Sequence, residues 1–144
     1  MIATLESGLR ALDHLPFAQA VRAAVHGSMA ILEAHRDFIR FLHIQALLSG
    51  KEAEVVYTEV IDRLRQSVAA GVEHFKTTGE VKPQADSTHW SNMMVSLVVS
   101  YFLQNQVFGQ SHKLGTDYLD YMIDTLVSAI GTGAAKAPGR EGSK

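Results

Sequence analysis

The feature of this sequence that most limits its fold is a segment over residues 87–130, which reads as two apolar helices joined by a short polar loop. The first helix is predicted over residues 88–108, and its apolar side chains lie nearly all round it: Trp90, Met94, Leu97, Tyr101 and Phe108 along one stripe, with Val95, Val98, Val99, Phe102 and Leu103 beside it. The second is predicted over residues 117–130, and its apolar set is Leu119, Met122, Ile123, Leu126, Val127 and Ile130. Because such helices must be covered on every side, we expect a second copy of the chain to cover part of this segment.

The composition is that of a single globular domain without thiol chemistry. The chain has 144 residues, of which 47% are hydrophobic and 19% are charged. The absence of cysteine excludes a disulfide framework and thiolate catalysis. The net charge is −2 and the lysines and arginines are scattered, so the sequence offers no basic patch for nucleic acid or for an anionic membrane. Neither a signal peptide nor a membrane-length apolar run is visible, so we expect a cytoplasmic protein.

The apolar periodicity predicts an all-α fold of about six helices. The three prolines, at positions 16, 83 and 138, fall in predicted breaks, and no segment shows the sustained alternation typical of strands. The helices are predicted over residues 2–12, about 16–34, 38–48, about 50–78, 88–108 and 117–130. Residues 132–144 are polar and aperiodic, so they are expected to form a disordered tail.

Several helix ends carry residues with capping chemistry. Asp86 or Ser87 can cap the start of the fifth helix, because a short polar side chain there accepts a hydrogen bond from a free backbone N–H. Gly79 suits the end of the fourth helix. On the exposed face of that helix Glu59 precedes Arg63 by four residues, which is the favourable order for an ion pair.

The sequence shows no arrangement of catalytic or metal-ligating residues. Of the seven histidines, none stands four residues from another and none follows a glutamate in a Glu-x-x-His motif, so no helical metal site is predicted. Neither a Gly-rich phosphate loop nor a Gly-x-Ser-x-Gly nucleophile turn is present. Asp86 and His89 have a suggestive spacing, but Asp86 is better used as a helix cap. We therefore expect neither enzymatic activity nor a bound metal or cofactor.

Methionine and aromatic side chains recur at helical spacing, which is typical either of a packed core or of an adaptable apolar cavity. His43 is open to both interpretations, since a histidine beside an apolar stripe is either an ordinary boundary residue or a polar contact in a pocket. If the second to fifth helices enclose a cavity, the residues predicted to bind its ligand are Met29, Phe38, Phe41, Leu42, His43, Tyr57, Ile61, Leu64, Trp90, Met93, Met94 and Tyr101.

The order of these helices resembles the C-terminal effector-binding and dimerisation domain of the TetR family of transcriptional repressors. A short striped helix ends at Leu12, and a break at residues 35–37 separates the next two helices. A long amphipathic helix follows, and then two capped apolar helices over residues 86–108 and 116–130. The likeness covers residues 1–131, which are the predicted ligand-binding and dimerisation domain.

The resemblance implies a homodimer that binds a small apolar or amphipathic effector. In that family the last two helices of each subunit form an intersubunit four-helix bundle, and the preceding helices surround the effector pocket. The residues predicted at the interface are Val98, Phe102, Leu119, Met122, Ile123 and Leu126. The family's N-terminal helix-turn-helix domain has no counterpart here, because residues 1–14 form a single stripe. The chain resembles the regulatory half alone, and DNA contact is expected only through a domain absent from it.

Two other interpretations stay open from the sequence. A small all-α enzyme or haem-binding protein fits the length and the number of histidines, but no histidine stands in a helical context preferred for an axial ligand. A dimerisation module without a ligand would use the same apolar helices.

Overall fold

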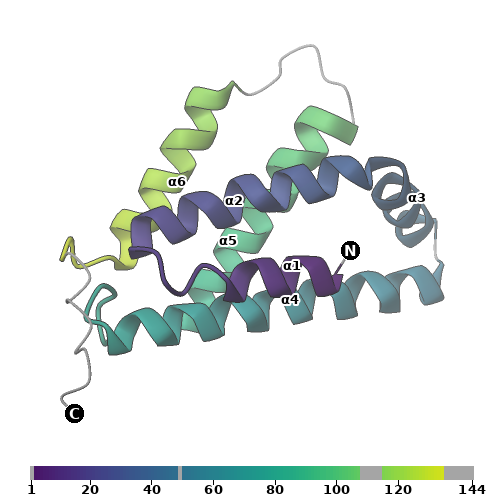
Figure 1. The fold of residues 1–144 in the computed structure, drawn as a ribbon. Helices are drawn as coiled ribbons and strands as arrows, with labels where there is room; N and C mark the ends of the chain where they lie inside the picture. The colour runs from purple at the N-terminus through teal and green to yellow at the C-terminus, as the bar shows by residue number, and fades with distance from the viewer. Residues whose placement is uncertain (1, 49, 108–114, 135–144) are drawn as a thin grey trace.

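The computed structural model describes residues 2–48, 50–107 and 115–134, and within them the chain is all-α (Figure 1). Its six α-helices are α1 (Ile2–Arg10), α2 (Phe17–Ala34), α3 (Arg36–Leu47), α4 (Lys51–Thr77), α5 (Ser87–Phe102) and α6 (Thr116–Ile130). A π-helical turn, Leu103–Val107, continues α5. The prediction of an all-α fold with about six helices is confirmed. None of these described helices has the length and apolar character that crossing a membrane requires.

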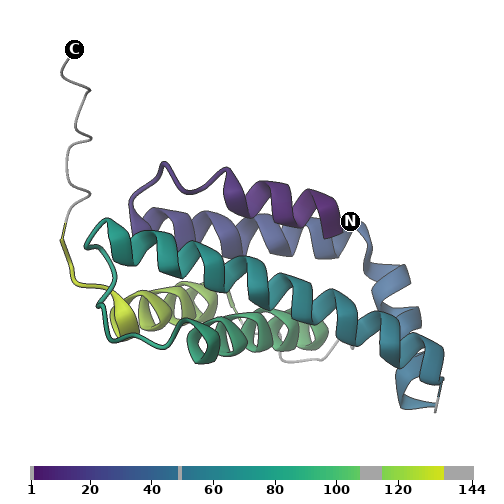
Figure 2. The ribbon, with the colours of Figure 1, turned by 90° about the horizontal axis from the view of Figure 1, so that it is seen from below.

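The helices pack around α2 and α4. Helices α1, α3 and α5 contact α4, while α1, α5 and α6 contact α2. Figure 2 shows α1 and α2 on one side of α4, with α5 and α6 on the other side. Helix α3 lies at the N-terminal end of α4 (Figure 1). The core therefore lies between α2 and α4, where α5 closes it.

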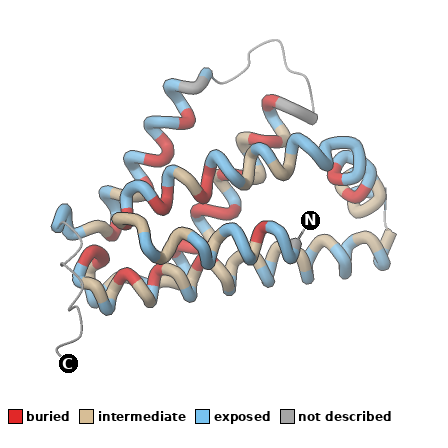
Figure 3. Tube along the Cα trace, in the orientation of Figure 1, coloured by how far each residue is buried: buried red, intermediate tan, exposed pale blue. Residues whose placement is uncertain are grey.

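Buried residues of α2, α4, α5 and α6 form one hydrophobic core, and Figure 3 marks the buried residues in red along the chain trace. The ring of Phe17 packs edge-on against Phe75, with centroids 5.3 Å apart, and lies 6.0 Å from the ring of Trp90. The indole N–H of Trp90 donates to the carbonyl oxygen of Leu126 at 2.9 Å. This hydrogen bond satisfies a buried donor and joins α5 to α6.

The residues predicted to contact a partner chain are buried within this one. Val98 and Phe102 on α5, and Leu119, Met122, Ile123 and Leu126 on α6, are 0–6% exposed. Helices α2 and α4 pack against α5, and α2 packs against α6, so they supply the cover that sequence reasoning assigned to a second copy. The assignment of these side chains to an interface is corrected, because they belong to the core of a single chain.

The ends of α4 and α5 follow the predicted capping. Gly79 has a φ of +79°, the left-handed conformation that glycine adopts without a Cβ penalty, and the N–H of Glu80 reaches back to the carbonyl of Phe75. The carboxylate of Asp86 accepts a hydrogen bond from the backbone N–H of His89 at 2.8 Å. That bond, followed by the one from the His89 ring, lowers the pKa of the Asp86 carboxyl. Both caps are local features, and the sequence revealed them.

A buried carboxylate ties the turn between α4 and α5 to the start of α2. Glu80 is 2% exposed, and its Oε1 accepts a hydrogen bond from the backbone N–H of Phe17 at 3.1 Å. Its Oε2 accepts one from the hydroxyl of Thr78 at 2.7 Å. The residue before α2 is Pro16, which makes no side-chain capping bond, so Glu80 supplies an acceptor for a free N–H of the first turn. The positive end of the helix dipole there favours its negative charge.

The chain after α6 is held against the same turn. Val81 and Gly131 form an isolated antiparallel bridge, and the N–H of Thr132 donates to the carbonyl of Glu80 at 2.9 Å. The ordered chain thus extends past residue 131, where the tail was predicted to begin. The part of that predicted tail over residues 135–144 lies outside the described residues.

Candidate ligand-binding site

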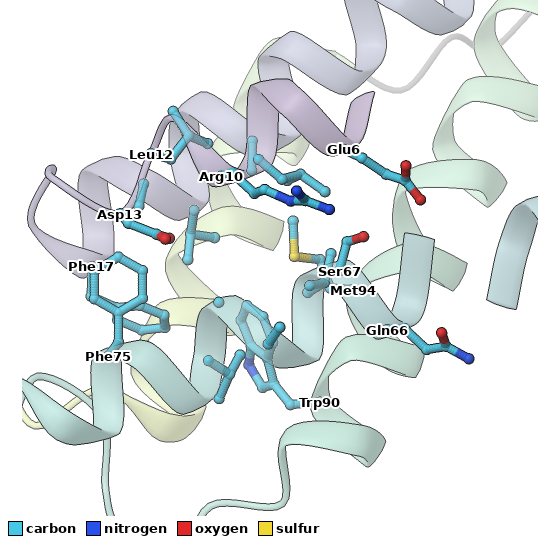
Figure 4. A pocket seen from close by; sticks show the side chains of 18 of the residues that line it. Glu6, Arg10, Leu12, Asp13, Phe17, Gln66, Ser67, Phe75, Trp90 and Met94 are labelled. Carbon is cyan, nitrogen blue, oxygen red and sulfur yellow. The ribbon is translucent and has the colours of Figure 1, made fainter. Parts of the chain in front are cut away.

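An open cleft of about 380 Å³ lies between α1, α2 and α4 (Figure 4). We call it the outer cleft. Trp90 and Met94 of α5 line it together with Phe17 and Phe75. Small residues keep it open, since Ala20 and Ala24 of α2 and Ala70 and Gly71 of α4 line its sides. A cleft of this volume falls within the range of small-molecule sites, about 300–1,000 Å³.

The rim of the outer cleft is polar. The guanidinium of Arg63 binds the carboxylate of Glu6 through two hydrogen bonds of 3.0 and 2.8 Å, which joins α4 to α1. Arg10 follows Glu6 by one helical turn on α1 and points into the cleft (Figure 4). Among the residues that the structure describes, no carboxylate forms an ion pair with Arg10. The rim therefore combines one mutually neutralised pair with a cation open to a ligand.

A second, smaller cavity lies deeper, between α1, α3, α4 and α5. We call it the inner cavity; its volume is about 70 Å³. The residues that line it are Leu5, Leu9, Ser28, Leu32, Ile39, Leu42, Tyr57, Val60, Ile61, Leu64, Val68, Met94, Val95, Val98, Val99 and Phe102. It exceeds the roughly 10–15 Å³ that one water needs, but its apolar walls offer almost no hydrogen bonds, and such cavities stay dry.

The two spaces meet at a shared wall. Leu9 of α1, Val68 of α4 and Met94 of α5 line both the outer cleft and the inner cavity. Methionine has an unbranched, flexible side chain that adapts to the shape beside it. Met94 thus separates the two spaces with a flexible side chain, and a change of its rotamer would alter the wall between them.

Tyr57 is the main polar group of the inner cavity. Burial raises the pKa of its phenol, and the positive charge of Arg65 acts in the opposite direction. The phenol is therefore neutral at physiological pH. Its ring also contacts the ring of His43, with centroids 6.1 Å apart. The inner cavity can offer a ligand a hydroxyl group but no charge.

The structure divides the predicted ligand-binding residues into four groups. Leu42, Tyr57, Ile61 and Leu64 line the inner cavity, Trp90 lines the outer cleft, and Met94 lines both. The predicted residues that line neither space are Met29, Phe38, Phe41, His43, Met93 and Tyr101.

Three of these six residues, Phe38, Phe41 and Met93, are exposed to solvent. Phe38 and Phe41 are 50% and 57% exposed, because α3 turns Ile39 and Leu42 inward instead. Met93 is 42% exposed on the outside of α5. Tyr101 stacks on Tyr118 of α6, with centroids 6.3 Å apart. Their apolar character was visible in the sequence, but the direction in which each helix turns it was not.

Sequence reasoning missed the contribution of α1. Leu5 and Leu9 line the inner cavity, and Glu6 and Arg10 stand at the outer cleft. The leucine stripe of this helix was visible in the sequence, but none of its residues was predicted to line the ligand site. Val98 and Phe102, predicted at a dimer interface, also line the inner cavity.

Within the described residues, no three His, Asp or Glu side chains gather in positions to hold a metal ion. Comparisons of the chain with protein-family models, with curated proteins and with solved structures find no match. The site itself is thus the basis for a functional proposal.

Proposed function

We propose that this chain is a small-molecule-sensing regulatory domain that binds a mostly apolar effector in the outer cleft and the inner cavity. The observation that carries the proposal is the pairing of an outer cleft of about 380 Å³ with an apolar cavity behind Met94. An apolar interior with a few convergent polar groups is the usual composition of a small-molecule site. The helix order that resembles TetR-type repressors supports a regulatory role.

Helix α1 is the element through which a ligand would act. Its residues line both spaces, and the Glu6–Arg63 pair holds it to α4. In the family that the chain resembles, the helix at this place leads to the helix-turn-helix domain. An effector that binds one position of α1 more tightly than another would shift such a linked domain by that difference in affinity. DNA contact would then belong to the linked domain and not to these residues.

The same proposal includes a homodimer through α5 and α6, by their outward faces instead of the buried side chains first predicted. Met93, Leu97 and Ser100 of α5 and Tyr118, Tyr121 and Thr125 of α6 form what we call the α5–α6 outer face. Of these, Tyr121 is 70% exposed, and Met93 and Tyr118 about 40%. The Tyr101–Tyr118 stack brings the two helices side by side. A face with exposed aromatic and methionine side chains is typical of an interface core.

Substitution of Gly71 tests the ligand site directly. Gly71 lines the outer cleft, and a Cβ added there would meet no atom within 4 Å. Gly71→Phe therefore fills the cleft with a phenyl ring without straining the helix. We expect lipophilic compounds to raise the melting temperature of the wild-type chain. At a hundredfold excess over Kd, the ligand should add about 2.7 kcal/mol to the free energy of unfolding. The melting temperature of Gly71→Phe should not change when the same compounds are added.

Two variants control for effects on the helix alone. Gly71→Ala leaves the cleft open and should bind as the wild type does, with about 0.5–1 kcal/mol more stability because helical glycine is costly. Gly27→Phe places the same ring on α2, outside both spaces and equally free of contacts. If no lipophilic compound stabilises the wild type, or if one stabilises Gly71→Phe as strongly, the proposed site is wrong.

A further inference from the structure

The charged rim, the outer cleft and the apolar inner cavity adjoin one another, because the cleft and the cavity share Leu9, Val68 and Met94. The mouth of the outer cleft carries the charged rim, its floor carries Trp90 and Met94, and the inner cavity behind Met94 is apolar. A ligand that matches this arrangement is polar at one end only. Resting on the function proposed above, we propose that the effector is a single-chain amphiphile with an anionic head group, whose head binds Arg10 and whose tail passes Met94 into the inner cavity.

Arg10 determines the sign of the head group. The other cation of the rim, Arg63, already binds both oxygens of Glu6. The remaining acid of the rim, Asp13, lies near Phe17, whereas Arg10 extends toward Ser67 and Met94 (Figure 4). An anion placed at Arg10 therefore meets a guanidinium beside the Ser67 hydroxyl. Arginine binds carboxylates through two parallel N–H donors, which suits a fatty carboxylate.

The inner cavity determines the shape of the tail. Its volume of about 70 Å³ is far below that of a site for a drug-sized molecule, so it can admit a few methylene groups but no ring system with its substituents. The tail would enter between Leu9, Val68 and Met94, which line both spaces and are all apolar. Each methylene that leaves water contributes about 0.8 kcal/mol, or about fourfold in affinity. Chain length therefore becomes the measurable variable.

The test is a titration of the full chain with straight-chain carboxylates from hexanoate to dodecanoate, each kept below the concentration at which it forms micelles. The fluorescence of Trp90 reports binding, because it is the single tryptophan of the chain and lines the outer cleft. We expect affinity to rise about fourfold per methylene and then to level off once the inner cavity is filled. Decanoate should bind more tightly than 1-decanol, and decyltrimethylammonium should bind most weakly.

Two variants separate the head from the tail. Arg10→Gln should weaken decanoate about five- to tenfold, in a salt-dependent way, and leave 1-decanol unchanged. Arg40→Gln is the matched control, since Arg40 is exposed on α3 and lines neither space. In Ile61→Phe the larger side chain occupies part of the inner cavity. We expect this variant to bind hexanoate as the wild type does, and to bind decanoate no more tightly than hexanoate.

The outcomes distinguish this inference from the function on which it rests. If decanoate and 1-decanol bind with equal affinity and Arg10→Gln changes neither affinity, the proposal of an anionic head group fails. The proposal of an apolar ligand site would still hold. If affinity does not depend on chain length, or Ile61→Phe preserves the dependence, the tail does not enter the inner cavity and the inference is overturned. If no amphiphile and no neutral lipophilic compound binds, both proposals fail.

Discussion

Met94 is the residue on which the two spaces depend. It is 4% exposed, yet it faces the outer cleft on one side and the inner cavity on the other. If the Met94 side chain is shortened, its neighbours can move into the gap that is left. If it is enlarged, the added atoms can enter the free volume beside it. From its burial alone, Met94 would be an ordinary core residue whose substitution costs much stability. The open space beside it predicts a smaller loss.

Substitutions at Met94 should cost little stability for a buried residue. Met→Ala in a packed core costs about 2–5 kcal/mol, and an oversized replacement costs about 1–3 kcal/mol. Because open space already adjoins Met94, we expect both Met94→Ala and Met94→Trp to fall below these ranges in urea denaturation, and Met94→Trp to weaken ligand binding. Met122 is the matched control, since it is also 4% exposed but lines neither space. Equal losses at the two positions would show that Met94 is tightly packed.

At the scale of elements, helices far apart in the chain stabilise one another through a few polar contacts. Arg63 was expected to pair with Glu59 on its own helix, but it binds Glu6 of α1 instead. Arg22 of α2 binds Asp120 and Asp124 of α6. Apart from Glu6, whose side chain is 16% exposed, the partners in these ion pairs are largely open to solvent, so the pairs orient helices more than they add stability. Glu80 differs, because its carboxylate is buried at the start of α2.

Removal of the Glu80 carboxylate should destabilise the junction of α2 with the α4–α5 turn. In Glu80→Ala the buried N–H of Phe17 loses its acceptor, which costs about 1–3 kcal/mol. Glu80→Gln keeps a carbonyl acceptor for that N–H, so we expect a clearly smaller loss. Chemical denaturation measures both, and hydrogen exchange at the Phe17 amide should accelerate in the alanine variant. If Glu80→Ala is as stable as the wild type, the hydrogen bond from the Phe17 N–H to Glu80 makes no net contribution to the free energy of unfolding.

At the scale of the whole molecule, the question is what the α5–α6 outer face contacts. Helix α5 contains no Asp, Glu, Lys or Arg, and the aspartates of α6 at positions 120 and 124 are paired with Arg22 of α2. Burial and then the negative charge of Asp117, in the first turn of α6, raise the pKa of the Tyr101 phenol, so one carboxylate adjoins this face. A dimer through it would bury on the order of 1,500 Å² in total if it has the size of a standard interface.

The pair Met93→Glu and Tyr121→Glu tests this dimer without disturbing the core. Both side chains are exposed, so we expect an unchanged melting temperature at low protein concentration and a monomer in sedimentation, where the wild type is a dimer. Leu47→Glu is the control, since Leu47 is 71% exposed on α3, outside this face, and should leave the dimer intact. A wild-type chain that sediments as a stable monomer at micromolar concentration would contradict the dimer.

The sequence by itself determined the helices and their local ends. The apolar spacing within each segment places α2 to α6 close to their observed bounds, and the caps at Gly79 and Asp86 act within a few residues of chain. These features depend on backbone geometry and on neighbours at fixed spacing, which a linear pattern records. The sequence also identified Tyr57, Ile61, Leu64 and Met94 as inward side chains of the site.

Only the tertiary structure decided what covers each apolar face. The spacing in α5 and α6 shows that their apolar side chains must be buried, but not that α2 and α4 of the same chain bury them. Tertiary packing also decides that α1 lines the site and that Phe38 and Phe41 turn outward. Cavities and long-range ion pairs arise where residues far apart in the chain meet, and their geometry depends on the rotation of each helix about its axis. Helical periodicity marks an apolar face but does not specify that rotation relative to the neighbouring helices.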